Sequence, residues 1–478
     1  MIRLNRRSGD IRTLLLASIT VSTITLASAA HAQSNDVVTT QDEIGGEYTG
    51  TFSGGLPHGN GSYKLPNGYE YTGDWVDGEI LGTGTARFPS GSIYEGEFAR
   101  GKPEGLGKIT FANGGTYEGE WKDGVINGQG IALYTNGARY EGQFLNAEHH
   151  GQGTIETPSG YKYEGAWVEG RKEGKGQITY PNGALYNGNV TDGTLAGFGK
   201  LTLTDGLVYE GEWLNNQMHG QGKLTQPNGD IYEGTLVAGR RQGLGKLTYA
   251  NGDIYEGNFE DDQRNGNGSF TGKDGYLYEG NWQDGRIEGQ GKVTYSDGSV
   301  YEGQFRADLA DGQGKITYPD GSTYDGAWVT GVINGQGTAT YANGLTYTGD
   351  FKDAQNHGQG VMTYQDGYRY EGGWQNNLRH GEAVVTYADG SIYTGQFAEG
   401  QRHGTGKVQM PDGFTYEGDW VEGSITGTGV ATYPNGDIYQ GGFVDSKREG
   451  EGTMRYASGQ EASGKWEDGA LVNGTTQN

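Results

Sequence analysis

The fold is decided by one stretch, Tyr117 to Arg139, which reads YEGEWKDGVINGQGIALYTNGAR. The pattern of a tyrosine, any residue and a glycine recurs on both sides of it, always at an interval of 23 residues. A fixed period of this length is the signature of a repeat architecture built from one small unit. A nineteenth copy, without its tyrosine, begins at Ala462, and the complete copies begin at Tyr48, Tyr71, Tyr94, Tyr117, Tyr140, Tyr163, Tyr186, Tyr209, Tyr232, Tyr255, Tyr278, Tyr301, Tyr324, Tyr347, Tyr370, Tyr393, Tyr416 and Tyr439.

Each copy carries the same turn signal near its end. When positions are counted from the tyrosine, positions 20 and 21 read Asn-Gly, Asp-Gly or Ser-Gly, as in Asn113-Gly114. Such a pair between alternating segments is a strong β-hairpin signal, because the favoured two-residue turn needs positive φ at both central residues. We therefore expect each copy to fold as two short antiparallel strands.

Alternation along a strand assigns the two faces of the predicted sheet. Positions 1, 3 and 5, such as Tyr94, Gly96 and Phe98, point to one face, and positions 2 and 4 point to the other. Positions 16 and 18 are expected to join the first face. Glycines at positions 3, 12 and 14 leave room for large rings to lie against bare backbone. The candidate docking aromatics on this ring face are Trp75, Trp121, Trp167, Trp213, Trp282, Trp328, Trp374, Trp420, Trp466, Tyr94, Tyr117, Tyr140 and Tyr163.

The predicted fold class is all-β, an elongated single-layer antiparallel sheet of about 19 stacked hairpins, similar to a solenoid. A single sheet cannot leave a whole face of rings in water. Curling of the sheet, contact with a second copy of the chain, or a bound partner must therefore cover that face. Curling is the simplest of the three, and contact in a homodimer comes next.

Composition rules out several classes of protein. Of 478 residues 93 are glycine, only 33% are apolar and the formal net charge is -25, values that alone would indicate disorder. The 33 tyrosines, 13 phenylalanines and 9 tryptophans argue against that interpretation, because regularly spaced rings supply a core. There is no cysteine, so disulfides and thiolate metal sites are excluded. The negative charge argues against nucleic acid and anionic lipid as partners.

The first 32 residues differ from everything that follows. Four arginines precede an uncharged run from Thr13 to Ala30, and Ala30-His31-Ala32 offers small residues for cleavage. This is the pattern of a secretory signal, which predicts a periplasmic or secreted protein. The expected organisation is a signal peptide (1–32), a polar leader (33–47), the repeat array (48–469) and a C-terminal tail (470–478).

The copies resemble the MORN repeat, the membrane occupation and recognition nexus family. The likeness rests on Tyr117-Glu118-Gly119-Glu120-Trp121, on Asp123-Gly124 and Gly128-Gln129-Gly130, and on the His-Gly step at His403-Gly404. It covers about nine-tenths of the chain. The resemblance implies stacked hairpins that act as a scaffold or docking surface, with lipid binding proposed for some members and dimerisation for others. Enzymes of the family carry catalysis in a separate domain, which this sequence does not show.

Two polar rows invite interpretation as metal sites. Position 11 is histidine in six copies, three of them consecutive at His357, His380 and His403. Equivalent positions two strands apart lie about 9.5 Å from each other, which is too far for one shared zinc ion. We therefore expect the histidines to support turns. Position 2 is mostly glutamate, and lysines at position 15, such as Lys108, are expected to pair with it across the hairpin, with no metal bound.

Position 5 changes character in one part of the array. The series alternates phenylalanine with tryptophan until Val190, Trp213 and Leu236, and its parity slips before Phe259. The segment from 186 to 245 is open to two interpretations, a bend or recognition patch, or a trace of duplication with looser packing.

No catalytic motif survives inspection of the sequence, neither a Gly-x-Ser-x-Gly elbow nor a phosphate-binding loop that leads into a helix. We expect a non-enzymatic scaffold without cofactor, which docks proteins of the cell envelope or forms a homodimer. The alternative is a peptidoglycan or glycan binder that stacks sugars on exposed tyrosine and tryptophan rings, since wall-binding repeats of similar size also combine glycine with aromatics. Association with membrane lipid is a third reading, which the charge opposes.

Overall fold

The computed structural model describes residues 37–477, so the predicted signal peptide at 1–32 lies outside the described residues. The described chain forms two compact units, which we call unit N (37–240) and unit C (241–477). Within the described residues there are strands, turns and bends but no helix. The fold class predicted from the repeats is confirmed, since both units consist of stacked antiparallel hairpins.

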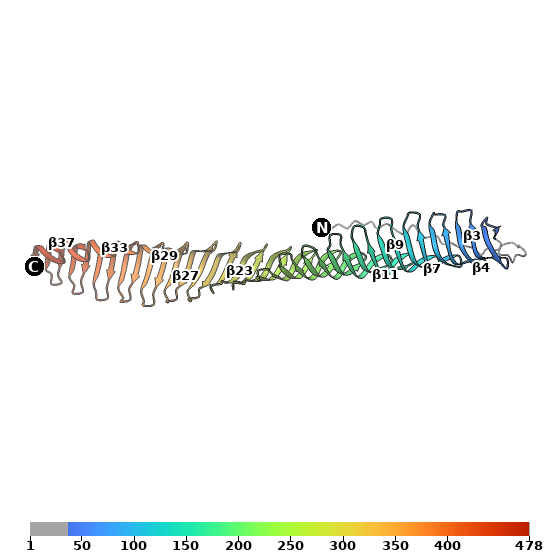
Figure 1. Ribbon diagram of the computed structural model, residues 1–478. Coiled ribbons are helices and arrows are strands. Elements are labelled where there is room, and N and C mark those ends of the chain that lie inside the picture. Colours follow the sequence, from blue (N-terminus) through green and yellow to red (C-terminus); the bar gives the residue numbers. More distant parts are fainter. Residues whose placement is uncertain (1–36, 478) are drawn as a thin grey trace. The chain divides into compact units, whose positions relative to one another are not determined.

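In unit N each strand is followed by its antiparallel neighbour along a twisted ribbon, drawn blue to green in Figure 1. The odd-numbered strands from β3 onward are the longer second strands of the copies. The strands are β1 (Val38–Gln41), β2 (Glu47–Ser53), β3 (Leu56–Lys64), β4 (Glu70–Val76), β5 (Glu79–Arg87), β6 (Ile93–Ala99), β7 (Lys102–Thr110), β8 (Thr116–Lys122), β9 (Val125–Leu133), β10 (Arg139–Leu145), β11 (Glu148–Glu156), β12 (Lys162–Val168), β13 (Arg171–Thr179), β14 (Leu185–Thr191), β15 (Thr194–Thr202), β16 (Val208–Leu214), β17 (Gln217–Thr225) and β18 (Ile231–Val237).

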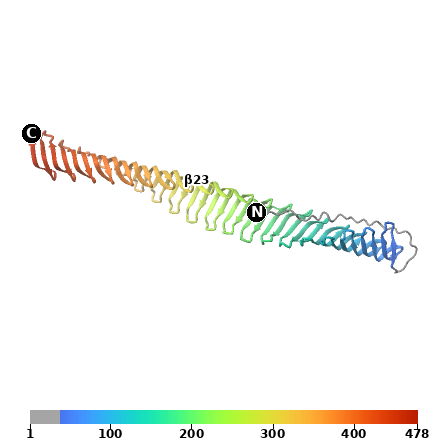
Figure 2. The ribbon, with the colours of Figure 1, turned by 90° about the horizontal axis from the view of Figure 1, so that it is seen from above.

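Unit C continues the same alternation of seven-residue and nine-residue strands, except that its last strand has eight residues and its first strand begins at Arg240, the last residue of unit N. Figure 2 shows its hairpins from a second direction. Its strands are β19 (Arg240–Thr248), β20 (Ile254–Glu260), β21 (Gln263–Thr271), β22 (Leu277–Gln283), β23 (Arg286–Thr294), β24 (Val300–Arg306), β25 (Leu309–Thr317), β26 (Thr323–Val329), β27 (Val332–Thr340), β28 (Thr346–Lys352), β29 (Gln355–Thr363), β30 (Arg369–Gln375), β31 (Leu378–Thr386), β32 (Ile392–Ala398), β33 (Gln401–Gln409), β34 (Thr415–Val421), β35 (Ser424–Thr432), β36 (Ile438–Val444), β37 (Lys447–Arg455), β38 (Glu461–Glu467) and β39 (Ala470–Gln477).

The tight turn of each copy lies at positions 7 and 8, and this differs from the sequence prediction. Arg100 and Gly101 both have positive φ (50° and 75°), as the two-residue turn between β6 and β7 requires. In the Asn113-Gly114 pair only the glycine has positive φ (91°). Asn113 instead accepts a hydrogen bond on its Oδ1 from the Gly115 N–H, at 3.0 Å. The pair therefore forms a wider loop that connects one copy to the next, and an Asx turn explains its Asn, Asp or Ser.

The second strand of each copy contains a bulge that bends the hairpin. In β6 and β7 the register runs from Tyr94 opposite Ile109 to Gly96 opposite Gly107, and then shifts before Phe98 pairs with Pro103. The Glu97 carboxylate at position 4 accepts a hydrogen bond from the Leu106 N–H beside the bulge, at 3.3 Å. Bulges increase local twist and bend a strand, which is how a single sheet curls around its own rings.

The tyrosine at position 1 lies directly on glycine backbone. A Cβ atom built on Gly96 or Gly107 would overlap the Tyr94 hydroxyl, so larger residues are disfavoured at these two positions. The Tyr94 hydroxyl donates to the Glu97 carbonyl at 2.9 Å, which satisfies its polar end. The glycines at positions 3 and 14 therefore allow close approach of the ring, as the sequence predicted. The prediction was wrong for position 12, since Gly105 has a φ of 65° and a Cβ built on it would meet the Glu97 side chain and not a ring.

The position-5 rings join each copy to the one before it. The Trp121 indole N–H donates to the Gly107 carbonyl of the preceding copy at 3.1 Å. Its ring packs edge-on against Tyr94 and Tyr117, with centroids 5.0 Å and 5.6 Å apart. Such edge-to-face pairs are a favoured aromatic geometry, and repetition of the pair along each unit produces a continuous core.

Both ends of the predicted array differ from expectation. The segment expected to be a polar leader contributes β1, which pairs with β2, and Asp42 accepts a hydrogen bond from the Tyr63 hydroxyl at 2.6 Å. The segment expected to be a tail contributes β39, which pairs with β38 in a register one residue shorter than in the other copies, with Ala462 opposite Thr476. Each segment pairs with the outermost strand of the array at its end of the chain. It thereby satisfies backbone groups of that strand that would otherwise be unpaired.

Candidate functional site

The aromatic residues proposed from the sequence as docking candidates are buried. The nine tryptophans at position 5 are between 1% and 8% exposed. Tyr94, Tyr117, Tyr140 and Tyr163 are at most 1% exposed. The chain itself covers its ring face by curling, so a second copy or a ligand is not needed for burial. These rings hold the copies together and offer no surface for a sugar or a protein.

Burial also fixes the ionisation of these phenols. Removal of Tyr163 from water raises the pKa of its hydroxyl to about 12, and the nearby Glu173 carboxylate adds to that effect. The pKa of Tyr94 is raised by the same cause. The tyrosines of the core therefore remain neutral hydrogen-bond donors over the physiological range of pH.

Position 11 supports the turn of the next copy. The Asp77 N–H, at the turn between β4 and β5, points to Nδ1 of His58 at 3.4 Å. Glu104 accepts a hydrogen bond from the Asp123 N–H in the same way, at 2.7 Å. Among the described residues no group of three or more histidine and carboxylate side chains is placed to hold a metal ion.

The outer face carries the predicted ladder of glutamates and lysines, but the ion pairs form between copies. In the strand register Lys108 lies opposite Glu95 of its own copy on one side and Glu118 of the following copy on the other. Its Nζ lies 3.3 Å from Glu118. Side chains in this pair are 50% and 68% exposed. Exposed pairs stabilise a protein by less than about 1 kcal/mol each, so this ladder is mainly a solvated surface.

Three large apolar side chains interrupt this polar face at position 13. Leu106, Phe198 and Leu244 are 62%, 58% and 71% exposed, whereas several other copies carry glutamine at the same position. Leu106 lies in a shallow hollow of about 550 Å³, which is also lined by Lys108, Glu118 and Ile131. An apolar side chain surrounded by charged groups matches the apolar centre and polar rim of a protein interface.

Unit N contains a buried cluster of ionisable groups at position 10. The His149 ring in β11 is stacked on Tyr140, with centroids 3.7 Å apart, and its Nε2 lies 2.6 Å from the Tyr134 hydroxyl. Burial lowers the pKa of His149 to about 4, and the charge of Lys172 contributes. Lys172 in β13 donates to the Tyr161 hydroxyl at 2.6 Å, and burial lowers its pKa to about 8.

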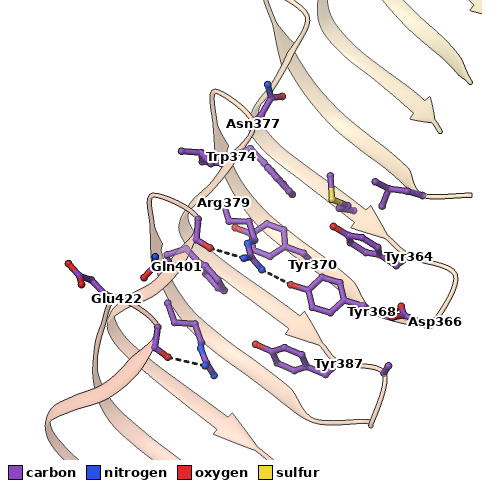
Figure 3. A pocket seen from close by; sticks show the side chains of 18 of the residues that line it. Tyr364, Asp366, Tyr368, Tyr370, Trp374, Asn377, Arg379, Tyr387, Gln401 and Glu422 are labelled. Atoms are coloured by element: carbon purple, nitrogen blue, oxygen red, sulfur yellow. Dashed lines mark hydrogen bonds between the residues drawn. The ribbon is translucent and has the colours of Figure 1, made fainter. Parts of the chain in front are cut away.

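Unit C holds an open groove at the equivalent place, over strands β30 to β33 (Figure 3). Its volume is about 1130 Å³. Figure 3 shows Tyr364, Tyr368 and Tyr387 along one wall, and Asn377 and Gln401 on the other. Tyr364 is 40% exposed, in contrast to the tyrosines of the core. The groove therefore presents ring surface that the sheet does not cover.

Two arginines line this groove. Arg379 donates from Nη1 to the Tyr368 hydroxyl and from Nη2 to the Gly400 carbonyl, both at 2.7 Å. Arg402 donates to the Gly423 carbonyl at 2.9 Å, and its guanidinium carbon lies 4.2 Å from the Trp420 ring centroid. These contacts fix the orientation of both guanidinium groups. Their remaining N–H donors are therefore already oriented before a ligand binds.

Comparison with known families now identifies the repeats. The family model described as MORN repeat matches eighteen times, from residues 48–68 to 439–461, and these matches cover most of the chain. The chain belongs to the MORN repeat family. This family is generally non-catalytic. No curated protein is similar enough to the chain to count as a match.

Solved structures show only distant likeness to this MORN repeat protein. The SAS-4 (dCPAP) TCP domain of Drosophila melanogaster, in complex with a proline-rich motif of Ana2, is 13% identical, and the match covers 45% of this chain and all of that one, with a TM-score of 0.20. The TCP10 domain of Danio rerio CPAP, in complex with a STIL peptide, is 12% identical over 66% and 94% of the two chains, with a TM-score of 0.14. A streptogramin B lyase is 14% identical over 63% and 92%, with a TM-score of 0.11.

The sequence interpretation missed both position 10 and position 18 as places of interest. Position 10 differs between copies, for example Pro103, His149 and Arg379. A position without a shared residue does not stand out when the copies are compared. Position 18 is tyrosine in five consecutive copies, at Tyr295, Tyr318, Tyr341, Tyr364 and Tyr387, and this row was visible in the sequence. The exposed fractions of the first four, 36–41%, could not be read from it because alternation placed them on the buried face.

Proposed function

We propose that this MORN repeat protein is a non-enzymatic scaffold of the cell envelope that docks other proteins on its outer face. The observation that carries the proposal is the exposure of Leu106, Phe198 and Leu244 on an otherwise charged surface. The rings of the core are already buried, so docking falls to the outward side chains.

The repeat geometry supports this role. In each unit successive copies present position 13 in the same register. In unit N the apolar contacts at Leu106 and Phe198 are therefore separated by a multiple of one copy spacing, about 9.5 Å. Nearest-neighbour contacts build such arrays, and their regular surfaces suit proteins that hold several partners in a line. Exposed Glu–Lys pairs around each apolar side chain provide a polar rim.

Export through residues 1–32 is part of the proposal, since the arginine-led apolar run is typical of a secretory signal. Fusion of residues 1–40 to a periplasmic alkaline phosphatase reporter tests it. We expect the reporter to become active, and an inactive reporter that accumulates uncleaved in the cytoplasm would contradict export.

The docking role is tested by capture from an envelope extract with a matched pair of variants. In the first, Leu106, Phe198 and Leu244 are all replaced by glutamine, the residue that other copies carry there. In the control, Gln129, Gln221 and Gln313 at the same position are replaced by alanine. We expect the first variant to lose a protein that the wild type and the control retain.

Equal capture by all three proteins would contradict docking on the outer face. Light scattering of the purified wild type and of both variants gives their masses. A dimer that dissociates only in the glutamine variant would show that the partner is a second copy of the chain. Absence of any hydrolase or transferase activity in the purified protein is expected, and an activity lost with a single polar substitution would overturn the non-enzymatic assignment.

A further inference from the structure

The tyrosines of the unit C groove form a braced platform. Tyr368 lies between Tyr364 and Tyr387, with ring centroids 5.1 Å and 5.6 Å away and interplanar angles of 82° and 70°. Arg379 anchors the hydroxyl of Tyr368 from below. The two outer rings are thereby held in fixed orientations, and Tyr364 keeps 40% of its surface in water. Rigid aromatic surface next to solvent is typical of a ligand site.

The charges of the groove are close to balanced. Asp366, Asp389 and Glu422 provide three carboxylates against the two guanidinium groups of Arg379 and Arg402. A polyanion would be repelled by the carboxylates and by the negative net charge of the chain. The charge therefore favours an uncharged ligand, one that exchanges hydrogen bonds with both donors and acceptors.

The groove offers hydrogen-bond donors and hydrogen-bond acceptors, and both belong to planar groups. Each guanidinium has five N–H donors, of which the contacts described above use two on Arg379 and one on Arg402. Carboxylates and the amides of Asn377 and Gln401 line the same space. Fixed forks of this kind bind pairs of adjacent hydroxyl groups, and a sugar ring presents such pairs around its edge and C–H groups on its faces.

An extended peptide fits less well. Peptides in extended form are commonly held by pairing with a free strand edge. Strands β30 to β33 are paired on both sides with their neighbours, so backbone groups are not offered along this floor.

The spacing of the two outer rings of the groove suits a polymer. Tyr364 and Tyr387 occupy position 18 of successive copies, and two strand spacings separate such positions by about 9.5 Å. A disaccharide of a linear β-linked polysaccharide has a similar length. We propose that the groove of unit C binds a linear, uncharged polysaccharide, with sugar rings on Tyr364 and Tyr387 and hydroxyl groups on Arg379 and Arg402.

This site differs from the one that the sequence suggested for a glycan. That hypothesis used the rings of positions 1 and 5, which are buried. The groove uses positions 18, 22 and 10. It is also independent of protein docking at Leu106, so that either proposal can fail alone.

Isothermal titration calorimetry tests the proposal, with the complete exported chain and two probes, cellotetraose and the tetramer of N-acetylglucosamine. We expect saturable binding of at least one probe, and affinity lowered at least tenfold in Tyr364→Ala and in Tyr387→Ala. Tyr295→Ala is the matched control, because Tyr295 has the same repeat position and is 36% exposed but lies outside the groove. We expect its affinity to stay within twofold of the wild type.

Near-ultraviolet circular dichroism confirms that each variant keeps its aromatic core. Binding should also change less than twofold between low and high salt, since no net charge is neutralised. Failure of the wild type to bind either probe would overturn the proposal. An equal loss of affinity in Tyr295→Ala, or binding that salt abolishes, would overturn it too, and the second result would indicate an ionic partner such as an acidic peptide.

Discussion

Strands β10 to β13 of unit N and β30 to β33 of unit C have the same pattern of strands and turns. Side chains fill the first region, whereas the second carries an open groove. Position 10 is His149 and Lys172 in the first region and Arg379 and Arg402 in the second. His149 stacks on Tyr140 at 3.7 Å and fills the space above the ring. Arg379 instead reaches across to the Gly400 carbonyl, and a groove of about 1130 Å³ stays open beside it.

The difference teaches that one repeat frame supports two kinds of surface. An imidazole stacked on a tyrosine ring fills the space inside the curled sheet and becomes part of the core. A guanidinium satisfies itself on backbone carbonyls and phenol oxygens, so it stays at the edge of the core with donors to spare. Function in this array is therefore set at a position that the repeat pattern leaves variable.

The largest expected effect comes from replacing the glycine beneath the closed region. In Gly153→Val the new Cβ would overlap the Tyr140 hydroxyl and ring. We expect the free energy of unfolding of unit N to fall by more than about 3 kcal/mol, because overpacking is added to the loss of ring contacts. Urea unfolding, with hydrogen exchange of residues 139–179, measures it.

The same repeat position in unit C, position 14, provides a direct comparison. That position already carries Ala383, so the equivalent Ala383→Val is expected to lower the free energy of unfolding by only about 1 kcal/mol. Gln152→Val, at an exposed neighbouring position of β11, is the control. If it destabilised the protein as much as Gly153→Val, the close packing of Tyr140 on glycine would not be the cause.

The second effect is a pH dependence that belongs to unit N. Because burial lowers the pKa of His149 from 6.5 to about 4, the unfolded chain takes up a proton between those values and the folded chain does not. Stability should therefore decline as pH falls from 6.5 to 4, by about 3 kcal/mol from this group.

His149→Leu tests this, since leucine stands at position 10 in the copy with Leu195. Urea midpoints at pH 7 and pH 4.5 should differ less in the variant than in the wild type. An unchanged difference would show that His149 titrates normally and is not buried as described.

Lys172→Met is expected to stabilise the protein at pH 7, by about 2 kcal/mol. The buried ammonium is disfavoured, since its pKa is lowered from 10.5 to about 8, and methionine already occupies position 10 at Met218. The gain should shrink as pH rises from 8 to 10.5, because the folded lysine becomes neutral first. Thermal unfolding at pH 7 and pH 10 measures this, and a loss of stability at pH 7 would contradict it.

Arg379→Met should act in the opposite direction and least strongly. It removes two hydrogen bonds of a charged group and leaves the Gly400 carbonyl without this donor, so we expect destabilisation of about 1 to 2 kcal/mol. Thermal unfolding in parallel with Lys172→Met gives the contrast directly. Stabilisation by both substitutions would remove the distinction between the two regions.

Much of the fold was predictable because it depends on local spacing. The 23-residue period, the rings at positions 1 and 5 and the glycines under them specify stacked hairpins with an aromatic face. The turn assignment was less successful. Asn113-Gly114 resembled the tight hairpin turn, but Arg100-Gly101 forms it, since the strand pairing decides which pair must take positive φ at both residues.

The candidate site was less predictable than the fold. Tyr364 and Tyr94 are both tyrosines on nominally inward positions, yet one is 40% exposed and the other is fully buried. Alternation along a strand predicts to which face of the sheet a side chain points, but not how deeply that side chain is buried. The bulge in the second strand, opposite position 4, bends each hairpin, and only that bend decides which inward positions reach the core and which lie at its edge.

The sequence by itself determined the unit, its period and the identity of its core, because these follow from contacts within one copy and with the next. The tertiary structure decided what the curled sheet covers and what it leaves open. That outcome depends on how His149, Lys172, Arg379 and Arg402 pack against rings and carbonyls contributed by other strands, and residue order alone does not encode such contacts.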